Sequence, residues 1–468
     1  MSQSVAPPAE IRQELGLRNL TLSQVLNIVG LFWVGVAAKL GPSHVMLWFA
    51  AAALFYLPSA AVVIYLNRAH TLEGGLYEWS RLGFNEFAGF LVGWNMWLNA
   101  VAILSYAGIQ AATMLAYALG PQAAWIGESS GALAVVTVVV IAMLVAIALA
   151  GMRVGKWVQD FGGAVLLVIF LALIALPPRS QLLGRPLPFR PFSLSLPAFS
   201  LLTLNLLGRM SFGAFSGFDG MAIFAGESRD AARNITRSVL LATPMIALMY
   251  ILGTGSIVAL VPREKIDMVS PISQALTLGT RPGDPGASLI PVVIIALLLS
   301  FLAAMALSFA ITTRLPMVAG WDKLLPEWFG RLDARRQTPV NSILFVGGVA
   351  LAMALAGAAG AGKQEAFQLL QTGAGVLYAL AYLAMFALPL FGKQRRTHPA
   401  PVWLQLASVS GFLTTALYLV LAIFPIIDVP KPLVYAAKLG GFIVACQLVA
   451  IGLYWSYRRR MRASYAQA

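Results

Sequence analysis

Long apolar runs, separated by short polar segments, follow one another along most of the chain. Each run is close to the roughly 20 apolar residues that a helix needs to cross a bilayer. The runs are apolar all round, as in helices surrounded by lipid or by other helices. The pattern predicts about twelve helices, over residues 20–38, 45–66, 86–118, 131–150, 157–177, 198–225, 236–261, 288–317, 339–358, 364–391, 402–426 and 433–457.

Composition supports an all-α integral membrane protein. Of the 468 residues, 59% are hydrophobic and 11% are charged, and the mean hydropathy is +0.80. Soluble domains carry roughly 25% charged residues, so this chain has too little polar surface for a soluble fold. No linker or low-complexity segment divides it. We expect a tail over residues 1–19, one membrane domain over 20–457 and a second tail over 458–468.

The basic residues predict an orientation. With the amino terminus inside, 21 of the 32 Lys and Arg lie in cytoplasmic segments and nine lie outside. Because Lys and Arg concentrate in cytoplasmic loops, both termini are expected in the cytoplasm. The net charge of +14 comes from these short loops, so it does not indicate a nucleic-acid partner. The expected location is the plasma membrane, which in a bacterium is the inner membrane.

The residues that carry most catalytic and metal chemistry are scarce. The single cysteine, Cys446, excludes an intramolecular disulfide framework, and the three histidines lack the spacing of a zinc or haem site. No nucleophile–base set and no G-x-x-x-x-G-K-[ST] phosphate loop occurs, so neither an enzyme nor an ATP-driven pump is expected. The chain is therefore expected to need no cofactor and no metal.

Two of the predicted helices contain interruptions. The first holds Gly30-Leu-Phe-Trp-Val-Gly35, and the sixth holds "FGAFSGFDG", residues 212–220. Broken helices at corresponding positions of two halves are a feature of membrane transporters built from inverted repeats, where the unwound backbone lines a mid-membrane site. A five-plus-five helix architecture follows. The alternative is close helix packing through small residues such as Gly213 and Gly217.

Two charged residues lie in the sixth helix. An ionisable group inside a membrane span is costly and normally faces a cavity or a charged partner, so Asp219 is a candidate for the site. On a regular helix, Arg209, Phe212 and Gly213 share one face by their i, i+3, i+4 spacing. Arg209 could therefore face the same cavity. The alternative is that it extends toward the membrane surface or pairs with Asp219 or another acid.

Several ordered motifs resemble the amino acid–polyamine–organocation permeases, which share the inverted-repeat fold of leucine-type transporters. Together they run from the second to the ninth predicted helix, and each alone is weak. They are "EGGLYEWSRLGFNEFAGFLVGWNMWL" (73–98), "GMRVGKWVQDFGG" (151–163), "FGAFSGFDGMAIFAGESRDAARN" (212–234) and "TRLPMVAGWDKLLPEWFGRLDARRQTPV" (313–340).

The resemblance implies a secondary transporter that moves an amino acid by alternating access. It implies a first repeat over about 20–177, a second over about 198–391, and two further helices over 402–457. The first and sixth helices would unwind near Gly30–Gly35 and Phe215–Asp219.

The resemblance also implies roles at the site. Main-chain N–H groups of Gly30, Trp33, Val34 and Gly35 would hold the substrate carboxylate, since unwound helix ends offer free donors. Carbonyls near Ser216 and Gly217 would accept from the substrate ammonium. Phe212 or Phe215 would be an aromatic gate, with Phe215 preferred, unless these rings are core residues.

The chain departs from the family pattern at three places. Trp33-Val34-Gly35 stands where the family reads Gly-small-Gly, so the tryptophan would fill or reshape the carboxylate site. The fifth helix has no lysine, which argues against a lysine-based proton switch. Ala231 and Thr236 replace prolines after the sixth helix.

Coupling and substrate stay open among several alternatives. The coupling ion could be H⁺, carried by Asp219, or Na⁺, held by carbonyls of the first helix and hydroxyls of Ser308, Thr312 or Thr313; exchange needs neither. Asp219 at the site would favour a cationic amino acid or polyamine, and Arg209 an acidic one. If Asp219 and Arg209 neutralise each other, a neutral substrate is favoured. With Trp33 nearby, we predict a neutral, apolar amino acid. A non-transporting sensor is the alternative.

Overall fold

The computed structural model describes residues 15–70, 75–321, 327–333, 338–358, 363–426, 429 and 431–467. Apart from one isolated bridge between Leu15 and Ser228, the regular structure of these residues is helical. The α-helices are α1 (Leu17–Ile28), α2 (Trp33–Ala38), α3 (His44–Ala51), α4 (Leu57–Ala69), α5 (Leu76–Gly83), α6 (Glu86–Leu119), α7 (Trp125–Glu128), α8 (Ser130–Ala150), α9 (Met152–Leu182), α10 (Leu201–Gly208), α11 (Ala231–Leu260), α12 (Pro271–Leu278), α13 (Ile290–Trp321), α14 (Val340–Ala358), α15 (Lys363–Phe391), α16 (Val402–Leu421) and α17 (Pro432–Gln467).

Within the described part of the chain, nine helical segments are long and apolar enough to span a membrane, and a shorter apolar helix covers Val340–Leu355. α3 and α4 form one of the nine, joined by a π-helical turn over Ala52–Tyr56. With the two broken helices, they account for the twelve predicted spans. The short helix α12 lies in the segment between the seventh and eighth predicted helices.

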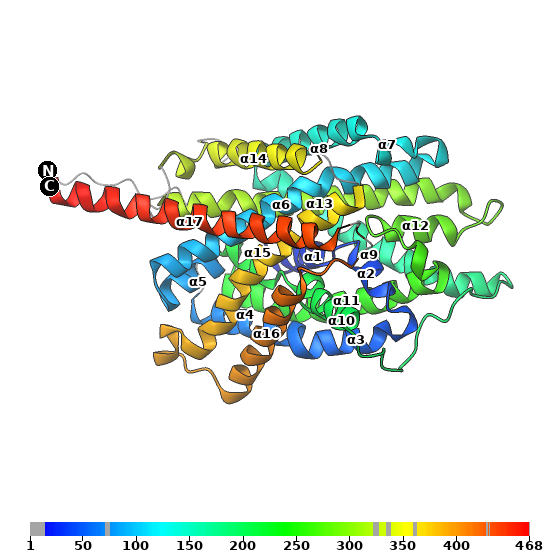
Figure 1. Cartoon of the computed structure of the whole chain (residues 1–468), viewed down its shortest axis with the longest axis horizontal. Coiled ribbons are helices and arrows are strands. Elements are labelled where there is room, and N and C mark those ends of the chain that lie inside the picture. Colours follow the sequence, from blue (N-terminus) through cyan, green and yellow to red (C-terminus); the bar gives the residue numbers. More distant parts are fainter. Residues whose placement is uncertain are drawn as a thin grey trace.

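The helices lie side by side in one bundle (Figure 1). α6 packs against α13 and α15, and α13 also packs against α9. α17 crosses the face of the bundle nearest the viewer, and its carboxyl-terminal part projects beyond the neighbouring helices (Figure 1). The helix continues to Gln467, so the segment expected as a tail from residue 458 is helical through Gln467.

Both predicted interruptions are present, but the first ends three residues earlier than expected. α1 ends at Ile28 and α2 begins at Trp33, so Val29–Phe32 is unwound. Trp33, Val34 and Gly35 are helical because the N–H groups of Trp33 and Gly35 already donate to the carbonyls of Gly30 and Phe32. Gly35 instead permits close packing, since a Cβ there would lie 2.8 Å from Pro271.

The sixth span consists of four pieces. α10 is followed by a π-helical turn over Arg209–Ala214, a non-helical link at Ser216 and Gly217, and a 3₁₀ helix over Phe218–Glu227. α11 then starts at Ala231 and includes Thr236, so the segment that lacks the family's prolines is helical.

Hydrogen bonds and one ion pair connect three segments at the side of the bundle where α1 begins. The N–H of Leu15 donates to the carbonyl of Glu227 at 3.0 Å, and the N–H of Arg229 donates to the carbonyl of Leu15 at 2.9 Å. The Glu227 carboxylate accepts from Arg314 of α13, with N···O distances of 2.6 and 2.7 Å. The Arg314 guanidinium also lies 4.8 Å from the ring centroid of Phe224. The end of the sixth span is thereby tied to both α1 and α13.

Candidate functional site

A cavity of about 160 Å³ lies between the two broken helices and α6, α13 and α15. At about 30 Å³ for each water, this volume corresponds to roughly five water molecules, which is comparable to a small organic solute. Aliphatic and aromatic side chains form much of its wall. Its polar side chains include Asn27, Asn99, Gln110, Ser216, Ser308 and Gln371.

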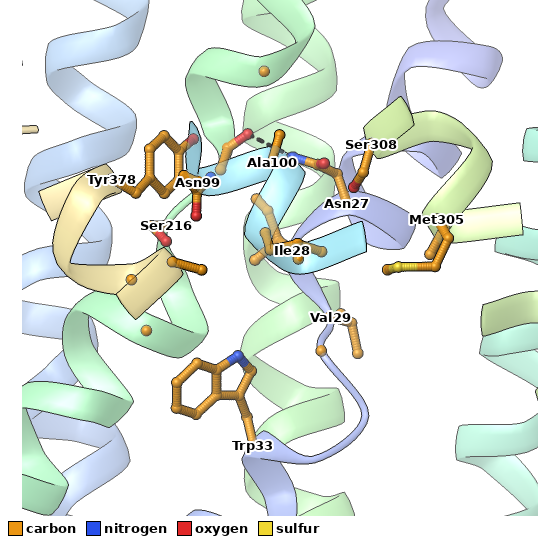
Figure 2. Close-up of a pocket in the computed structure, with 18 of the residues that line it drawn as sticks. Asn27, Ile28, Val29, Trp33, Asn99, Ala100, Ser216, Met305, Ser308 and Tyr378 are labelled. Carbon is orange, nitrogen blue, oxygen red and sulfur yellow. Dashed lines mark hydrogen bonds between the residues drawn. The ribbon is translucent and has the colours of Figure 1, made fainter. Parts of the chain in front are cut away.

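The link in the sixth span is shaped by Gly217. Its φ of 128° is a conformation that L side chains rarely adopt, so glycine is required here. The N–H of Gly217 donates to the Tyr382 hydroxyl at 2.8 Å, and its carbonyl accepts from the amide of Asn27 at 3.0 Å. Figure 2 shows this Asn27 amide beside Ser308 of α13. The two broken helices are therefore joined directly at the cavity wall.

Tyr250 of α11 joins the same two helices a second time. Its hydroxyl lies 2.7 Å from the carbonyl oxygen of Ile28 and 3.0 Å from that of Ala214, and it accepts from the N–H of Gly30 at 3.0 Å. The ring is fully buried and stacks on Trp48 at a centroid distance of 4.7 Å. One side chain thus holds polar main-chain groups of both interruptions.

The unwound segment of the first span retains free donors. The N–H groups of Leu31 and Phe32 have no hydrogen-bond acceptor among the described residues, and both residues line the cavity. Buried main-chain donors are nearly always paired, so these two groups are available to a solute.

Asp219 is the one formally charged residue among those described at the cavity wall. Its Oδ1 accepts from the hydroxyls of Tyr378 and Tyr382, both at 2.6 Å, while Oδ2 is buried without a hydrogen-bond partner in the described part. The structure places no cationic side chain in an ion pair with it, as far as the described residues go. In its ionised form this buried carboxylate is stabilised by two hydroxyl groups but by no cationic side chain of the described residues.

Arg209 does not line the cavity, contrary to the face expected from its spacing. The π-helical turn over Arg209–Ala214 changes the angular relation between these residues, because it has more residues per turn than an α-helix. The fully buried guanidinium donates to the side chains of Asn205 and Thr372 and to the carbonyl of Phe424, at 3.1 to 3.4 Å. Neither alternative, an exposed side chain or a pair with Asp219, describes this environment.

The remaining predicted site residues divide into two groups. Those that line the cavity are Gly30, Trp33, Phe212, Ser216, Gly217, Asp219 and Ser308, and those that do not are Val34, Gly35, Phe215 and Thr312.

Phe215 and Thr312 are occupied elsewhere for local reasons. The Phe215 ring stacks on Tyr56 at 4.1 Å and contacts Trp48 and Tyr250, so it is a core residue, and Phe212 is the phenylalanine at the cavity. The Thr312 hydroxyl donates to the carbonyl of Ser308 in its own helix, at 2.6 Å. This internal bond is common for hydroxyls in membrane helices.

Four residues of the site were missed from the sequence. Asn27, Tyr250, Tyr378 and Tyr382 hold the interruptions or Asp219. Three of them had a detectable signal. Tyr378 and Tyr382 share a helix face by their i, i+4 spacing. Asn27 is also polar within an apolar span. Nothing in the sequence distinguishes Tyr250 from other tyrosines of the core.

Replacing Gly217 by alanine tests whether the link must keep this conformation. A Cβ would lie 2.9 Å from Asn27 Nδ2 and 3.0 Å from Ile28 Cγ1, on a backbone that costs roughly 1–3 kcal/mol for a residue with a side chain. Gly217→Ala should lower the free energy of unfolding by that amount and reduce substrate uptake about tenfold or more. Gly348→Ala is the control, because nothing lies within 4 Å of its added Cβ. If Gly217→Ala were as stable and as active in uptake as the wild type, the link would not depend on the conformation of glycine at this position.

Comparison with known proteins places the chain among transporters. A family model described as amino acid permease matches residues 15–446. An uncharacterized transporter of Mycobacterium tuberculosis is 27% identical over 84% of each chain. A probable agmatine/putrescine antiporter of Lactococcus lactis is 23% identical over 88% of each chain. A putative arginine/ornithine antiporter of Escherichia coli is 24% identical over 69% of this chain and 71% of its own.

The family match covers nearly the whole described chain, including both broken helices and the cavity between them. An all-helical architecture of about twelve spans agrees with it. The chain belongs to the amino acid permease family, whose members are membrane transporters and not enzymes.

Proposed function

We propose that this protein transports a cationic amino acid or a related amine, by alternating access around the cavity between the broken helices. The observation that carries the proposal is Asp219, the one formal charge among the described lining residues, whose Oδ2 lacks a partner. A cationic substrate would supply the missing positive charge. The relatives described as agmatine/putrescine and arginine/ornithine antiporters support this substrate class.

This proposal differs from the neutral substrate expected from the sequence. That expectation required Arg209 to neutralise Asp219, and the Arg209 guanidinium instead contacts Asn205, Thr372 and Phe424. An acidic substrate would need Arg209 at the cavity, which it does not line. The described lining therefore favours a positively charged group.

The substrate would lie between two different ends of the cavity. The free N–H groups of Leu31 and Phe32 would hold a carboxylate, and Asp219 with Tyr378 would face the cationic group. Apolar residues such as Ile28 and Met305 would contact its aliphatic part. The donors come from the unwound residues and not from Val34 and Gly35.

For coupling, we propose exchange of substrates or a proton on Asp219. Sodium has less support, because neither Thr312 nor Thr313 is among the described residues that line the cavity, and the Asn27 amide beside Ser308 joins α1 to Gly217. The orientation proposed is the one expected from the basic loops, with both termini cytoplasmic and the protein in the plasma membrane.

Uptake into proteoliposomes tests the proposal. Purified protein is reconstituted, the vesicles are loaded with unlabelled substrate or left empty, and labelled arginine, agmatine, leucine and glutamate are supplied with and without pH or Na⁺ gradients. We expect saturable uptake of arginine or agmatine, faster into loaded vesicles, and little uptake of glutamate. Uptake restricted to leucine or glutamate would overturn the substrate class. Binding without flux under every gradient would favour a sensor.

A further inference from the structure

The indole of Trp33 lies against both broken helices. A Cβ added to Gly213 would lie 2.2 Å from ring atom Cη2, and a Cβ on Gly30 would lie 2.6 Å from Cδ1. The ring therefore occupies space that exists because both positions are glycine. It also contacts the Phe32 ring at a centroid distance of 4.5 Å and is 6% exposed. This packing gives the indole a defined position at the cavity wall.

The indole N–H of Trp33 has no hydrogen-bond acceptor among the residues that the structure describes. Three other tryptophans are paired: Trp48 donates to Thr254, Trp79 to the carbonyl of His70, and Trp94 to that of Cys446, at 2.9 to 3.1 Å, whereas the buried nitrogen of Trp97 is unpaired. Buried indoles usually find such partners. Figure 2 shows the Trp33 nitrogen on the edge of the ring turned toward the cavity and not away from it. The Trp33 nitrogen is therefore free to donate a hydrogen bond to a solute in the cavity.

The neighbouring groups indicate what that acceptor is. The N–H groups of Leu31 and Phe32, on the chain immediately before Trp33, are also without acceptors in the described structure. Three donors thus gather at one end of the cavity, whereas Figure 2 shows Asn27, Ser308 and Tyr378 toward the other. An indole N–H can donate but cannot accept, so it cannot pair with an ammonium group.

We infer that the indole N–H of Trp33 donates a hydrogen bond to the substrate carboxylate, so that Trp33 selects an amino acid over the amine formed by its decarboxylation. The inference rests on the proposed function and deepens it. The tryptophan that replaces a family glycine at position 33 would then supply a hydrogen-bond donor to the site. It would not block the carboxylate site beside the unwound segment.

The test compares matched substrates on purified wild-type protein and Trp33→Phe, which keeps an aromatic ring but removes the donor. Dissociation constants are measured for arginine with agmatine and for lysine with cadaverine. Loss of a hydrogen bond to a charged group should weaken arginine and lysine binding roughly tenfold to a hundredfold. Agmatine and cadaverine should bind within about twofold of their wild-type values, as expected for ligands that make no bond to the indole.

Trp97→Phe is the matched control. Its indole nitrogen is also unpaired and buried, but the residue does not line the cavity, so the ratio of arginine to agmatine affinity should not change. Equal weakening of both members of each pair by Trp33→Phe would overturn the inference, because the ring would then act only as a wall. An unchanged arginine affinity would overturn it as well.

If Trp33→Phe is less stable than the wild type, a second variant is used to test the hydrogen bond. Replacement of Trp33 by 3-benzothienylalanine keeps the size and shape of the indole and removes only the N–H donor. The same selective loss of amino acid binding is expected. If the wild-type protein binds neither member of any pair, the proposed function fails first, and that outcome is distinct from wild-type binding with unchanged selectivity.

Discussion

Asp219→Asn should abolish measurable uptake of cationic substrates while the protein still folds. Asparagine has nearly the same shape and keeps an oxygen for the hydroxyls of Tyr378 and Tyr382, which lie 2.6 Å from Oδ1. It removes the one formal charge described at the cavity wall. Losing one partner of a buried charge pair costs about 2–5 kcal/mol, which predicts a fall of roughly thirtyfold or more in the affinity for arginine or agmatine.

The measurement is binding and proteoliposome uptake by the same preparation, with thermal unfolding in detergent as a check on the fold. Glu264→Gln is the control, since Glu264 is exposed in a short 3₁₀ helix over Arg263–Lys265 and does not line the cavity. Wild-type affinity for arginine and agmatine in Asp219→Asn would contradict the proposed role. Preserved exchange, together with loss of uptake driven by a pH gradient, would instead assign Asp219 to proton coupling.

Glu227→Gln should give the largest loss of stability among the variants considered. Glu227 is 4% exposed, and its Oε1 accepts from two guanidinium nitrogens of Arg314. Because glutamine leaves Arg314 as an uncompensated, largely buried cation, the free energy of unfolding should fall by roughly 3 kcal/mol. Denaturant or thermal unfolding in detergent measures the change.

A double replacement separates the pair from its surroundings. Glu227→Gln with Arg314→Met removes both charges and should recover much of the lost stability, since an apolar replacement of a buried pair is often close to neutral. Arg18→Met is the comparison at the same side of the bundle. The Arg18 side chain is 79% exposed, and its Nη2 lies 3.7 Å from Asp160 Oδ2, so at most about 1 kcal/mol is expected. An effect of Glu227→Gln no larger than that of Arg18→Met would contradict the prediction.

The spans and the existence of two interruptions could be predicted because they depend on local composition. A bilayer requires long apolar helices, and glycine and polar residues within such a helix weaken it wherever the rest of the chain lies. The position of the first interruption could not be predicted as well. Gly30 and Gly35 both allow it, and only the bonds of Trp33 and Gly35 to preceding carbonyls show that the helix restarts at Trp33.

Side-chain direction was the weaker part of the prediction. A regular helix would place Arg209 with Phe212, but the π-helical turn directs Arg209 toward Thr372 and away from the cavity. Phe215 and Phe212 are equally plausible gates in the sequence. In the structure, Tyr56 stacks on Phe215, and Phe212 lines the cavity.

The amino-acid sequence was sufficient to establish a membrane protein of about twelve helices, its two weakened helices and the unusual carboxylate of Asp219, because each follows from residue type and spacing alone. The tertiary structure was needed for the pairing of that carboxylate with Tyr378 and Tyr382, the exclusion of Arg209, and the place of the Trp33 indole between Gly30 and Gly213. These contacts join residues that are far apart along the chain. Their geometry depends on how whole helices pack, which local patterns do not encode.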